Sequence, residues 1–283
     1  MVKEKLRFLN PNVPHQHGGG HPALDLRNLD IRYNGRKAID NLSLQVDSGL
    51  SVAVVGPNGA GKSTLFHVLA GVLPPASGSA RVHGHLPTKH LCTAYVPQSR
   101  QVDWSFPVCV ADVVMMGRTG LLGLLKPPNS HDRKVVEQSL EKAGMSHLAE
   151  RQISELSGGQ KQRMFIARAL AQEADLMLLD EPLAGLDLSS QEKVFGILED
   201  LKVSGVTVLF ATHDLVLAGE KFDRILLLNK KLIAYGDRIE VLRTENLSAT
   251  FGGQVQMVDT VDGRAMIGDM GGHHDHDEEG PHG

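Results

Sequence analysis

Glycines, a lysine and two hydroxyl side chains come together in the stretch Gly56-Pro57-Asn58-Gly59-Ala60-Gly61-Lys62-Ser63-Thr64. It fits the pattern G-x-x-x-x-G-K-[ST] of a phosphate-binding loop. Glycines let backbone N–H groups converge on phosphate oxygens, where a Cβ would obstruct them. Lys62 supplies a positive charge for the β- and γ-phosphates, and the Ser63 hydroxyl is a hard oxygen ligand suited to Mg²⁺. The stretch therefore predicts a nucleoside triphosphate site; an ordinary glycine-rich turn between a strand and a helix is the alternative.

The residues on either side of this loop predict the elements that would hold it. Residues 50–55 form a short, mainly apolar run that is typical of a buried strand. Residues 63–73 carry apolar side chains at helical spacing before Pro74 and Pro75 end the pattern. A helix that begins at the loop points its positive N-terminal end at the phosphates.

Other segments predict the remaining architecture. Residues 24–33 and 38–46 alternate apolar and polar side chains, as antiparallel strands do. Between residues 158 and 235 strands alternate with helices, which is typical of a parallel sheet. The clearest further elements are helices at 131–143 and 189–202 and a strand at 224–228.

Polar side chains stand at the ends of three strand-like runs. Asp180 and Glu181 end one apolar run, Gln98 closes a short strand, and His213 follows a third run. Carboxylate, amide and imidazole groups of this kind could bind a metal ion, orient water or contact a phosphate.

The order of these motifs carries a family resemblance. Leu156-Ser157-Gly158-Gly159-Gln160 lies between the loop and the paired carboxylates, and Ala184-Gly185-Leu186-Asp187 follows them. Over residues 24–244 the chain resembles the ATP-binding-cassette (ABC) ATPases. The resemblance implies an α/β fold, a P-loop NTPase of the ABC type with a parallel core sheet, an antiparallel β edge subdomain and an inserted helical subdomain at about 100–157. It implies ATP and Mg²⁺ as cofactors.

The resemblance also implies roles for single residues. Asp180 would hold Mg²⁺ directly or through water, opposite Ser63, and Gln98 would meet Mg²⁺ and the attacking water. Glu181 would accept a proton from that water or orient it; a second metal carboxylate is the alternative. His213 would contact the γ-phosphate, with a structural histidine as the alternative. The expected catalytic residues are thus Lys62, Gln98, Glu181 and His213, and the expected magnesium ligands are Ser63, Gln98 and Asp180.

Further residues are expected at the nucleotide. Tyr33 would stack on adenine, although packing at the sheet edge is an alternative. The Ser157 hydroxyl and glycine amides at a helix start form an anion site, which the family places against the nucleotide of another copy. Because this chain carries one cassette, we expect a head-to-tail dimer with Asp187 at the contact. The expected nucleotide-binding residues are Tyr33, Gly56, Pro57, Asn58, Gly59, Ala60, Gly61, Lys62, Ser63, Thr64, Gln98, Ser157, Gly158, Gly159, Gln160 and Asp187.

The segments 99–107, 110–118 and 181–187 look like those of cassettes from manganese, zinc or iron importers. Trp104, close to Phe106, offers an apolar anchor for a partner helix; a core residue of the helical subdomain is the alternative. The expected partners are integral membrane permease subunits and, indirectly, an extracytoplasmic substrate-binding protein. Two other interpretations are an importer of siderophore or haem, and a non-transport ABC ATPase in Fe–S assembly or on nucleic acid.

Bulk properties agree with a transport ATPase. A net charge of −4 over 283 residues gives no overall basic footprint, so no nucleic-acid partner is expected. No apolar run approaches the roughly 18–20 residues that span a bilayer, and residues 1–13 lack the core of a signal peptide. We expect a peripheral protein on the cytoplasmic face of the membrane. Cys92 and Cys109 fit a reducing compartment and are expected to be small buried hydrophobes.

The two ends of the chain differ from the middle. We expect a flexible leader at 1–22, the nucleotide-binding domain at 23–245 and an extension at 246–283. Imidazoles and carboxylates mix near the C-terminus in a pattern suited to Zn²⁺, Mn²⁺ or Ni²⁺. The candidate ligands are His273, His274, His276 and His282. A solvated, disordered tail that takes up metal adventitiously is the alternative.

Overall fold

The computed structural model describes residues 21–33, 35–87, 92–98, 104–122, 127–252, 255–260 and 263–268. For the last two ranges it describes the backbone alone. Most of the expected leader and all four candidate metal-binding histidines of the tail lie outside the described residues.

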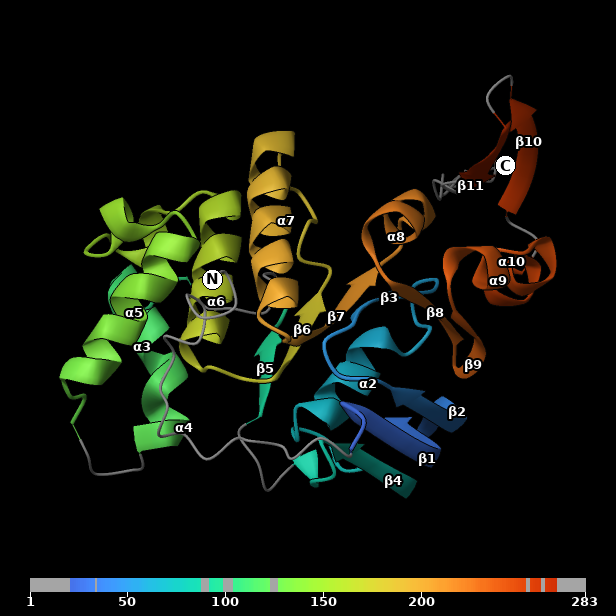
Figure 1. Cartoon of the computed structure of the whole chain (residues 1–283), viewed down its shortest axis with the longest axis horizontal. Helices are drawn as coiled ribbons and strands as arrows, with labels where there is room; N and C mark the ends of the chain where they lie inside the picture. The colour runs from blue at the N-terminus through green and yellow to red at the C-terminus, as the bar shows by residue number, and fades with distance from the viewer. Residues whose placement is uncertain are drawn as a thin grey trace, which may run out of the picture.

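A six-stranded sheet forms the centre of the molecule (Figure 1), with the order β5-β6-β7-β3-β8-β9. The strands are β3 (Ser51–Val55), β5 (Thr93–Val96), β6 (Leu176–Asp180), β7 (Thr207–Thr212), β8 (Arg224–Asn229) and β9 (Lys231–Gly236). The first five in this order are parallel, and β9 pairs antiparallel with β8. Every residue of β3, β6 and β7 is buried, as a parallel sheet covered on both faces requires. The predicted parallel core is confirmed.

An antiparallel sheet packs beside the core. It consists of β1 (Leu24–Tyr33), β2 (Arg36–Val46) and β4 (Ser77–Val82) in the order β2-β1-β4. The buried residues of β1 and β2 share one apolar cluster with residues of β3 and of α2 (Lys62–Leu69), among them Ile31, Val52 and Leu65. This sheet is the predicted antiparallel edge subdomain.

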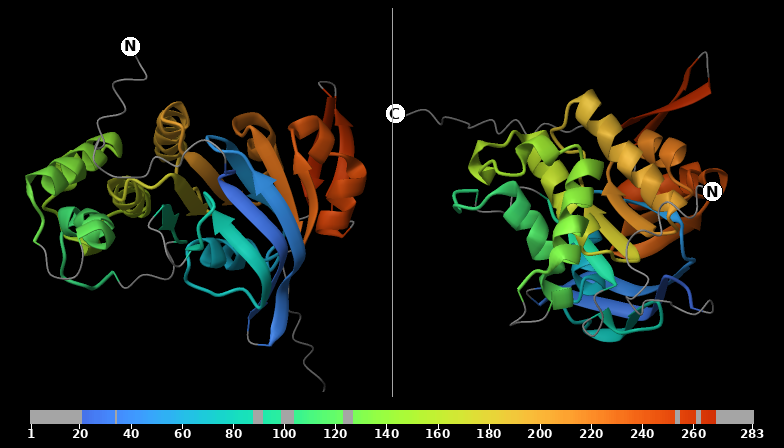
Figure 2. Two further views of the ribbon diagram at one scale, coloured as in Figure 1. Left: turned by 60° about the horizontal axis from the view of Figure 1, so that its bottom comes forward. Right: turned by 60° about the vertical axis from the view of Figure 1, so that its left-hand side comes forward.

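A helical subdomain projects from the other side of the sheet (Figure 2). It contains α3 (Val110–Met115), α4 (Thr119–Leu122), α5 (Ser130–Lys142) and α6 (Gly158–Ala171), with short 3₁₀ turns at Met116–Arg118, Ser146–Leu148 and Ile153–Glu155. Val114, Leu140 and Phe165 bury their side chains in one cluster. The predicted inserted helical subdomain is present, and α6 shares its core.

Trp104 packs at the surface of this subdomain. Its ring centroid lies 5.6 Å from that of Phe165, and Lys161 Nζ lies 4.4 Å from the indole centroid. Trp104 is half-buried, whereas Phe106 is 58% exposed. Of the two interpretations of Trp104, the geometry favours packing on the helical subdomain and leaves Phe106 as an exposed apolar side chain.

Helix α2 is shorter than the sequence pattern predicts. It ends at Leu69, and Gly71 adopts φ +72°, the left-handed conformation that commonly follows a helix. The apolar spacing continues to Leu73, but Gly71 has no Cβ to oppose this turn. The prediction that the helix runs to residue 73 was therefore wrong by one turn.

The remaining elements follow the core sheet. They are α7 (Leu188–Val203), α8 (Leu215–Lys221), α9 (Arg238–Val241), α10 (Thr244–Phe251), and a hairpin of β10 (Val255–Thr260) and β11 (Gly263–Gly268). Leu247 of α10 is buried with Ile225 and Leu227 of β8. The packed unit therefore continues through α10, past the boundary expected at residue 245.

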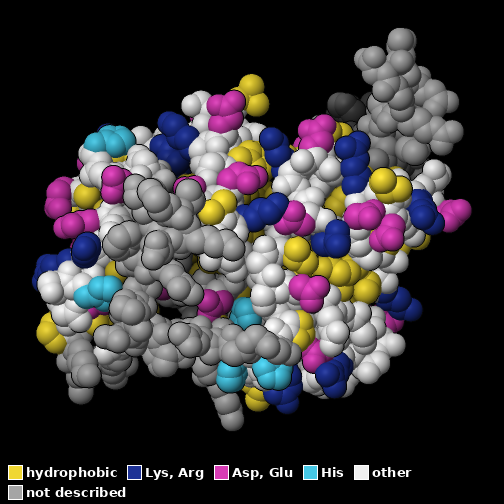
Figure 3. Space-filling view, in the orientation of Figure 1, with side chains coloured by type: hydrophobic (Ala, Val, Ile, Leu, Met, Phe, Trp, Pro, Cys, Tyr) yellow, Lys and Arg dark blue, Asp and Glu magenta, His cyan; other side chains and the backbone are white. Residues whose placement is uncertain are grey.

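One face of the molecule carries charged side chains of both signs. On the face shown in Figure 3, Lys and Arg side chains are interspersed with Asp and Glu, and neither sign covers a continuous area. None of the helices in the described part of the chain combines the length and apolar character needed to cross a bilayer. Cys92 is buried, and burial raises the pKa of its thiol to about 11. Cys109 is only half-buried, so the expected burial holds for Cys92 alone.

Candidate functional site

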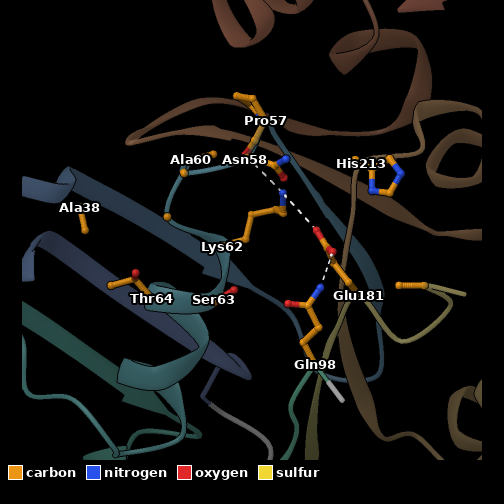
Figure 4. A pocket seen from close by; sticks show the side chains of 13 residues that line it. Ala38, Pro57, Asn58, Ala60, Lys62, Ser63, Thr64, Gln98, Glu181 and His213 are labelled. Carbon is orange, nitrogen blue, oxygen red and sulfur yellow. Dashed lines mark hydrogen bonds and ion pairs between the residues drawn. The ribbon is translucent and has the colours of Figure 1, made fainter. Parts of the chain in front are cut away.

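A pocket of about 750 Å³ opens where the carboxyl ends of four neighbouring strands meet (Figure 4). The loop after β3, Gln98 after β5, Glu181 after β6 and His213 after β7 all line it. These strands are adjacent in the order β5-β6-β7-β3. The topology of the sheet therefore brings together side chains that lie far apart in the sequence.

The phosphate loop takes a conformation that favours glycine at two positions. Gly59 and Gly61 adopt φ +79° and +100°. A Cβ added to Gly56 would lie 2.1 Å from the carbonyl oxygen of Leu228, and one added to Gly61 would lie 2.8 Å from that of Ala38. The loop therefore packs its backbone directly on β8 and β2, and α2 begins at the pocket with Lys62.

Lys62 is held inside the loop. Its side chain is 6% exposed, and Nζ donates to the Gly56 carbonyl oxygen at 2.7 Å. Nζ also lies 3.8 Å from Glu181 Oε1. Burial lowers the pKa of Lys62, and the charges of Glu181 and Asp180 oppose that shift. The ammonium group thus lies between the loop carbonyls and the carboxylates at the end of β6.

Glu181 is positioned by both its backbone and its side chain. It adopts φ +47°, although it is not a glycine. Its N–H donates to the Ala211 carbonyl oxygen at 3.2 Å, and its Oε2 accepts a hydrogen bond from Gln98 Nε2 at 3.0 Å. Such backbone conformations cost about 1–3 kcal/mol and occur often at functional sites. Nothing in the apolar run before Glu181 predicts this conformation.

Asp180, the last residue of β6, is 4% exposed and is not among the residues that line the pocket. Burial raises the pKa of its carboxyl group, while hydrogen bonds from Ser63 and Tyr95 oppose the rise. Tyr95 Oη lies 3.3 Å from Asp180 Oδ2. Sequence reasoning missed Tyr95; the one available signal was a hydroxyl-bearing aromatic three residues before Gln98.

The oxygen atoms of Asp180 and Ser63 fit Mg²⁺, because hard cations prefer carboxylate and hydroxyl ligands. The Ser63 hydroxyl is close enough to Asp180 to lower the pKa of its carboxyl group, as expected for two side chains that could share an ion. Among the residues that the structure describes, no group of three or more His, Cys, Asp or Glu side chains could hold a metal ion. A magnesium site here would therefore take its other ligands from the nucleotide, from water or from Gln98.

His213 and Tyr33 lie differently with respect to the pocket. His213 is exposed and lines the pocket. Tyr33, at the end of β1, is 59% exposed and is not among the residues that line the pocket. Its ring is accessible to solvent, so stacking on adenine stays a prediction. Ala38 and Ala184 also line the pocket and were not predicted, because alanine carries no chemical signal.

The stretch Ser157-Gly158-Gly159-Gln160 at the start of α6, called the signature stretch below, forms a second surface. Ser157 is the N-cap of α6, where its Oγ accepts from Gln160 N at 3.4 Å and its N–H donates to Gln160 Oε1 at 2.9 Å. In this single copy, Ser157, Gly158, Gly159 and Gln160 do not line the pocket. The helix start instead presents backbone N–H groups outside the chain's own phosphate loop.

Asp187 lies next to this second surface. As the N-cap of α7 it accepts hydrogen bonds from Ser190 N at 2.8 Å and Ser190 Oγ at 3.0 Å, and these bonds lower the pKa of its carboxyl group. A Cβ on Gly159 would lie 2.9 Å from Ser190 Oγ. The signature helix and the start of α7 are therefore packed against each other.

Known proteins are similar to this chain in sequence. A model of the ABC transporter family matches residues 39–184. The manganese transport system ATP-binding protein MntB of Bacillus subtilis (strain 168) is 44% identical over 233 residues, which cover 82% of this chain and 93% of that protein. The zinc transport system ATP-binding protein TroB of Treponema pallidum (strain Nichols) is 42% identical, with coverage of 82% and 88%.

Solved structures agree. A putative metal-chelate type ABC transporter in an inward-facing conformation has a TM-score of 0.74 at 35% identity, and the match covers 88% of this chain and 98% of that one. A dimeric ATP-binding cassette in a post-hydrolysis state, bound to ADP and Pi, has a TM-score of 0.67 at 25% identity, with coverage of 76% and 98%. The chain belongs to the ABC transporter family, whose ATP-binding domains hydrolyse ATP to power transport. The predicted family and fold are confirmed.

Proposed function

We propose that this chain is the ATP-hydrolysing subunit of a membrane importer for divalent metal ions (manganese, zinc or iron) or their chelates. The observation that carries the hydrolytic part is the pocket that joins the phosphate loop to Gln98, Glu181 and His213. The cargo is inferred from relatives named for manganese and zinc transport and from a solved transporter of the metal-chelate type. The second candidate cargo is a siderophore or haem, and the similarity to the metal-chelate type transporter supports it.

The proposed site binds ATP with Mg²⁺. Ser63, Gln98 and Asp180 are the residues that would hold the ion together with the nucleotide. When bound, Mg²⁺ neutralises charge on the β- and γ-phosphates. Lys62 Nζ moves from the Gly56 carbonyl to the phosphates, because a charged phosphate oxygen is the stronger acceptor.

Hydrolysis follows from the placement of the side chains. Glu181 accepts a proton from the attacking water or orients it, and Gln98 keeps the Glu181 carboxylate in place through the 3.0 Å hydrogen bond. His213 contacts the γ-phosphate, and Tyr33 stacks on adenine. In this proposal the residues at the strand ends do the chemistry, and the loop binds the nucleotide.

The site is completed by a second copy. ABC ATPase relatives work as dimers. We propose a head-to-tail arrangement in which Ser157, Gly158, Gly159 and Gln160 of one copy close over the nucleotide held by the other, with Asp187 at the contact. The position of these residues outside the pocket of a single copy supports this arrangement.

The other proposed partners are integral membrane permease subunits and, through them, an extracytoplasmic substrate-binding protein. The chain then lies on the cytoplasmic face of the membrane as a peripheral subunit.

Two measurements test the proposed function. The first is co-purification with a membrane protein, and the second is uptake of radioactive Mn²⁺, Zn²⁺ or Fe²⁺ by cells that carry either the natural chain or Glu181→Gln. Co-purification with a cytosolic scaffold and unchanged metal uptake would contradict it.

The C-terminal histidines are a separate proposal. We propose that His273, His274, His276 and His282 bind a transition metal and tune transport. Calorimetry of the full chain with Zn²⁺ should show a binding phase that disappears when all four are replaced by Asn. The control is His147→Asn, in a 3₁₀ turn of the helical subdomain. An unchanged isotherm in the fourfold variant would end the idea.

A further inference from the structure

Tyr95, near the carboxyl end of β5, contacts both the phosphate-loop helix and a carboxylate of β6. Its Oη lies 3.3 Å from Asp180 Oδ2 and 3.3 Å from His67 Nε2. The rings of Tyr95 and His67 meet edge to face, with centroids 5.5 Å apart and planes at 83°. These contacts form a chain of polar groups from α2 through β5 to Asp180.

The number of protons determines how this chain is arranged. A phenol has one proton to donate, and an ionised carboxylate can only accept. If Tyr95 donates to Asp180, its oxygen is left to accept a hydrogen bond from His67 Nε2. If Tyr95 donates to His67 instead, Asp180 Oδ2 loses a donor. A buried carboxylate oxygen without a donor is costly, so the first arrangement is favoured.

The same face of α2 reaches Asp180 by a second route. Ser63 and His67 are four residues apart on this helix and therefore share a face. The Ser63 hydroxyl is close enough to interact with the Asp180 carboxyl group, and His67 reaches Asp180 through Tyr95. If the Ser63 hydroxyl bound Mg²⁺, Tyr95 would still donate to the Asp180 carboxylate and would keep it in place.

We propose that Tyr95 is a positioning residue for Asp180, donating to Oδ2, and that His67 orients the Tyr95 hydroxyl by donating from Nε2. The inference rests on the proposed role of Asp180 in holding Mg²⁺ with ATP. Two residues of β5 and the segment after it would then position the two carboxylates that end β6. Gln98 hydrogen-bonds to Glu181, and Tyr95 hydrogen-bonds to Asp180.

The first test measures the histidine directly. Long-range ¹H–¹⁵N spectra of the natural protein, without nucleotide or metal, should show His67 with its proton on Nε2. In Tyr95→Phe the acceptor is gone, and the His67 resonances should shift. A His67 tautomer protonated only on Nδ1 would overturn the proposal.

The second test separates magnesium binding from nucleotide binding. Tyr95→Phe keeps the ring and removes the hydroxyl, so the Mg²⁺ concentration at half-maximal binding to the ATP-loaded protein should rise about tenfold. ATP affinity in EDTA should not change. His67→Gln, which keeps an N–H donor, should resemble the natural protein, whereas His67→Leu should resemble Tyr95→Phe. Tyr235→Phe, on β9 at the far edge of the sheet, is the matched control.

Asp180→Asn separates the proposed magnesium site from the proposed positioning role of Tyr95. If Asp180→Asn binds Mg²⁺ with ATP as the natural protein does, the proposed magnesium site is wrong. If Asp180→Asn loses Mg²⁺ binding but Tyr95→Phe and His67→Leu do not, the site stands and the positioning role of Tyr95 is wrong.

Discussion

Glu181 combines a strained backbone with several contacts at the pocket. Its φ of +47° is maintained because its N–H bonds to Ala211 and its carbonyl accepts from Ala184 N at 3.2 Å. The carboxylate meets Gln98 on one side and Lys62 on the other. Among single residues, these contacts therefore direct the Glu181 carboxylate into the pocket beside the phosphate loop.

Replacing this carboxylate separates binding from turnover. Glu181→Gln preserves the size of the side chain and an acceptor for Gln98, so ATP affinity should stay within about twofold while turnover falls about 10²–10⁴-fold. Lys62→Ala should instead weaken ATP binding itself. Equilibrium binding and single-turnover hydrolysis measure both effects, with Glu192→Gln on the exposed side of α7 as the control. Normal turnover in Glu181→Gln would contradict the assigned role.

Among the elements, the phosphate loop packs so closely on β8 that it leaves no room for a side chain at Gly56. Gly56→Ala would place a Cβ 2.1 Å from the Leu228 carbonyl oxygen. Overpacking of this kind costs about 1–3 kcal/mol, so the midpoint of urea unfolding should fall.

A second glycine provides a control with the opposite sign. Gly196 lies inside α7, and nothing lies within 4 Å of an added Cβ. Gly196→Ala should stabilise the protein by about 0.5–1 kcal/mol, because alanine favours the helix. Equal changes in stability for Gly56→Ala and Gly196→Ala would show that the contact with Leu228 does not exclude a side chain at Gly56.

Asp223, just before β8, hydrogen-bonds to residues of α7 and β3. Its carboxylate accepts from Lys202 Nζ at 2.6 Å, Ser51 N at 3.0 Å and Ser51 Oγ at 2.8 Å. Burial tends to raise the pKa of Asp223, but the hydrogen bonds from Lys202 and Ser51 outweigh it and lower the pKa below its usual range.

This lowered pKa predicts how the stability of the fold changes with pH. The unfolded state binds the proton more readily, so the contribution of Asp223 is complete above about pH 4, its unfolded pKa, and is lost as the pH falls through the folded pKa. Asp223→Asn should lower stability at pH 7 and flatten the fall in stability below about pH 4. Chemical unfolding at several pH values measures this, with Asp47→Asn as an exposed control. A parallel shift at every pH would contradict the assignment.

Apolar runs, glycines and the spacing of polar residues predicted most of these elements. The buried strands β3, β6 and β7 appear as continuous apolar runs. Glu181 and His213, which follow β6 and β7, line the pocket, whereas Asp180 does not. The contacts of Tyr95, the φ of Glu181 and the burial of Leu247 could not be predicted, because they depend on neighbours that are distant in sequence. The apolar spacing also did not predict the early end of α2, which Gly71 follows with a positive φ.

At the scale of the whole molecule, the pocket and the signature surface are separate within one copy. Neither Ser157 nor Gly159 lines the pocket, although both lie at the start of a helix whose N–H groups suit an anion. If these surfaces meet only between copies, hydrolysis requires association. The rate of ATP hydrolysis should then rise more steeply than linearly with protein concentration at low micromolar levels. A constant turnover number at every concentration would count against the dimer.

A crystal structure of Glu181→Gln with ATP and Mg²⁺ would show whether two copies share each nucleotide site. We expect each triphosphate to lie on the Lys62 loop of one copy and to be covered by Ser157–Gln160 of the other. A structure in which each copy encloses its own nucleotide, without contact from a partner, would rule out the shared site.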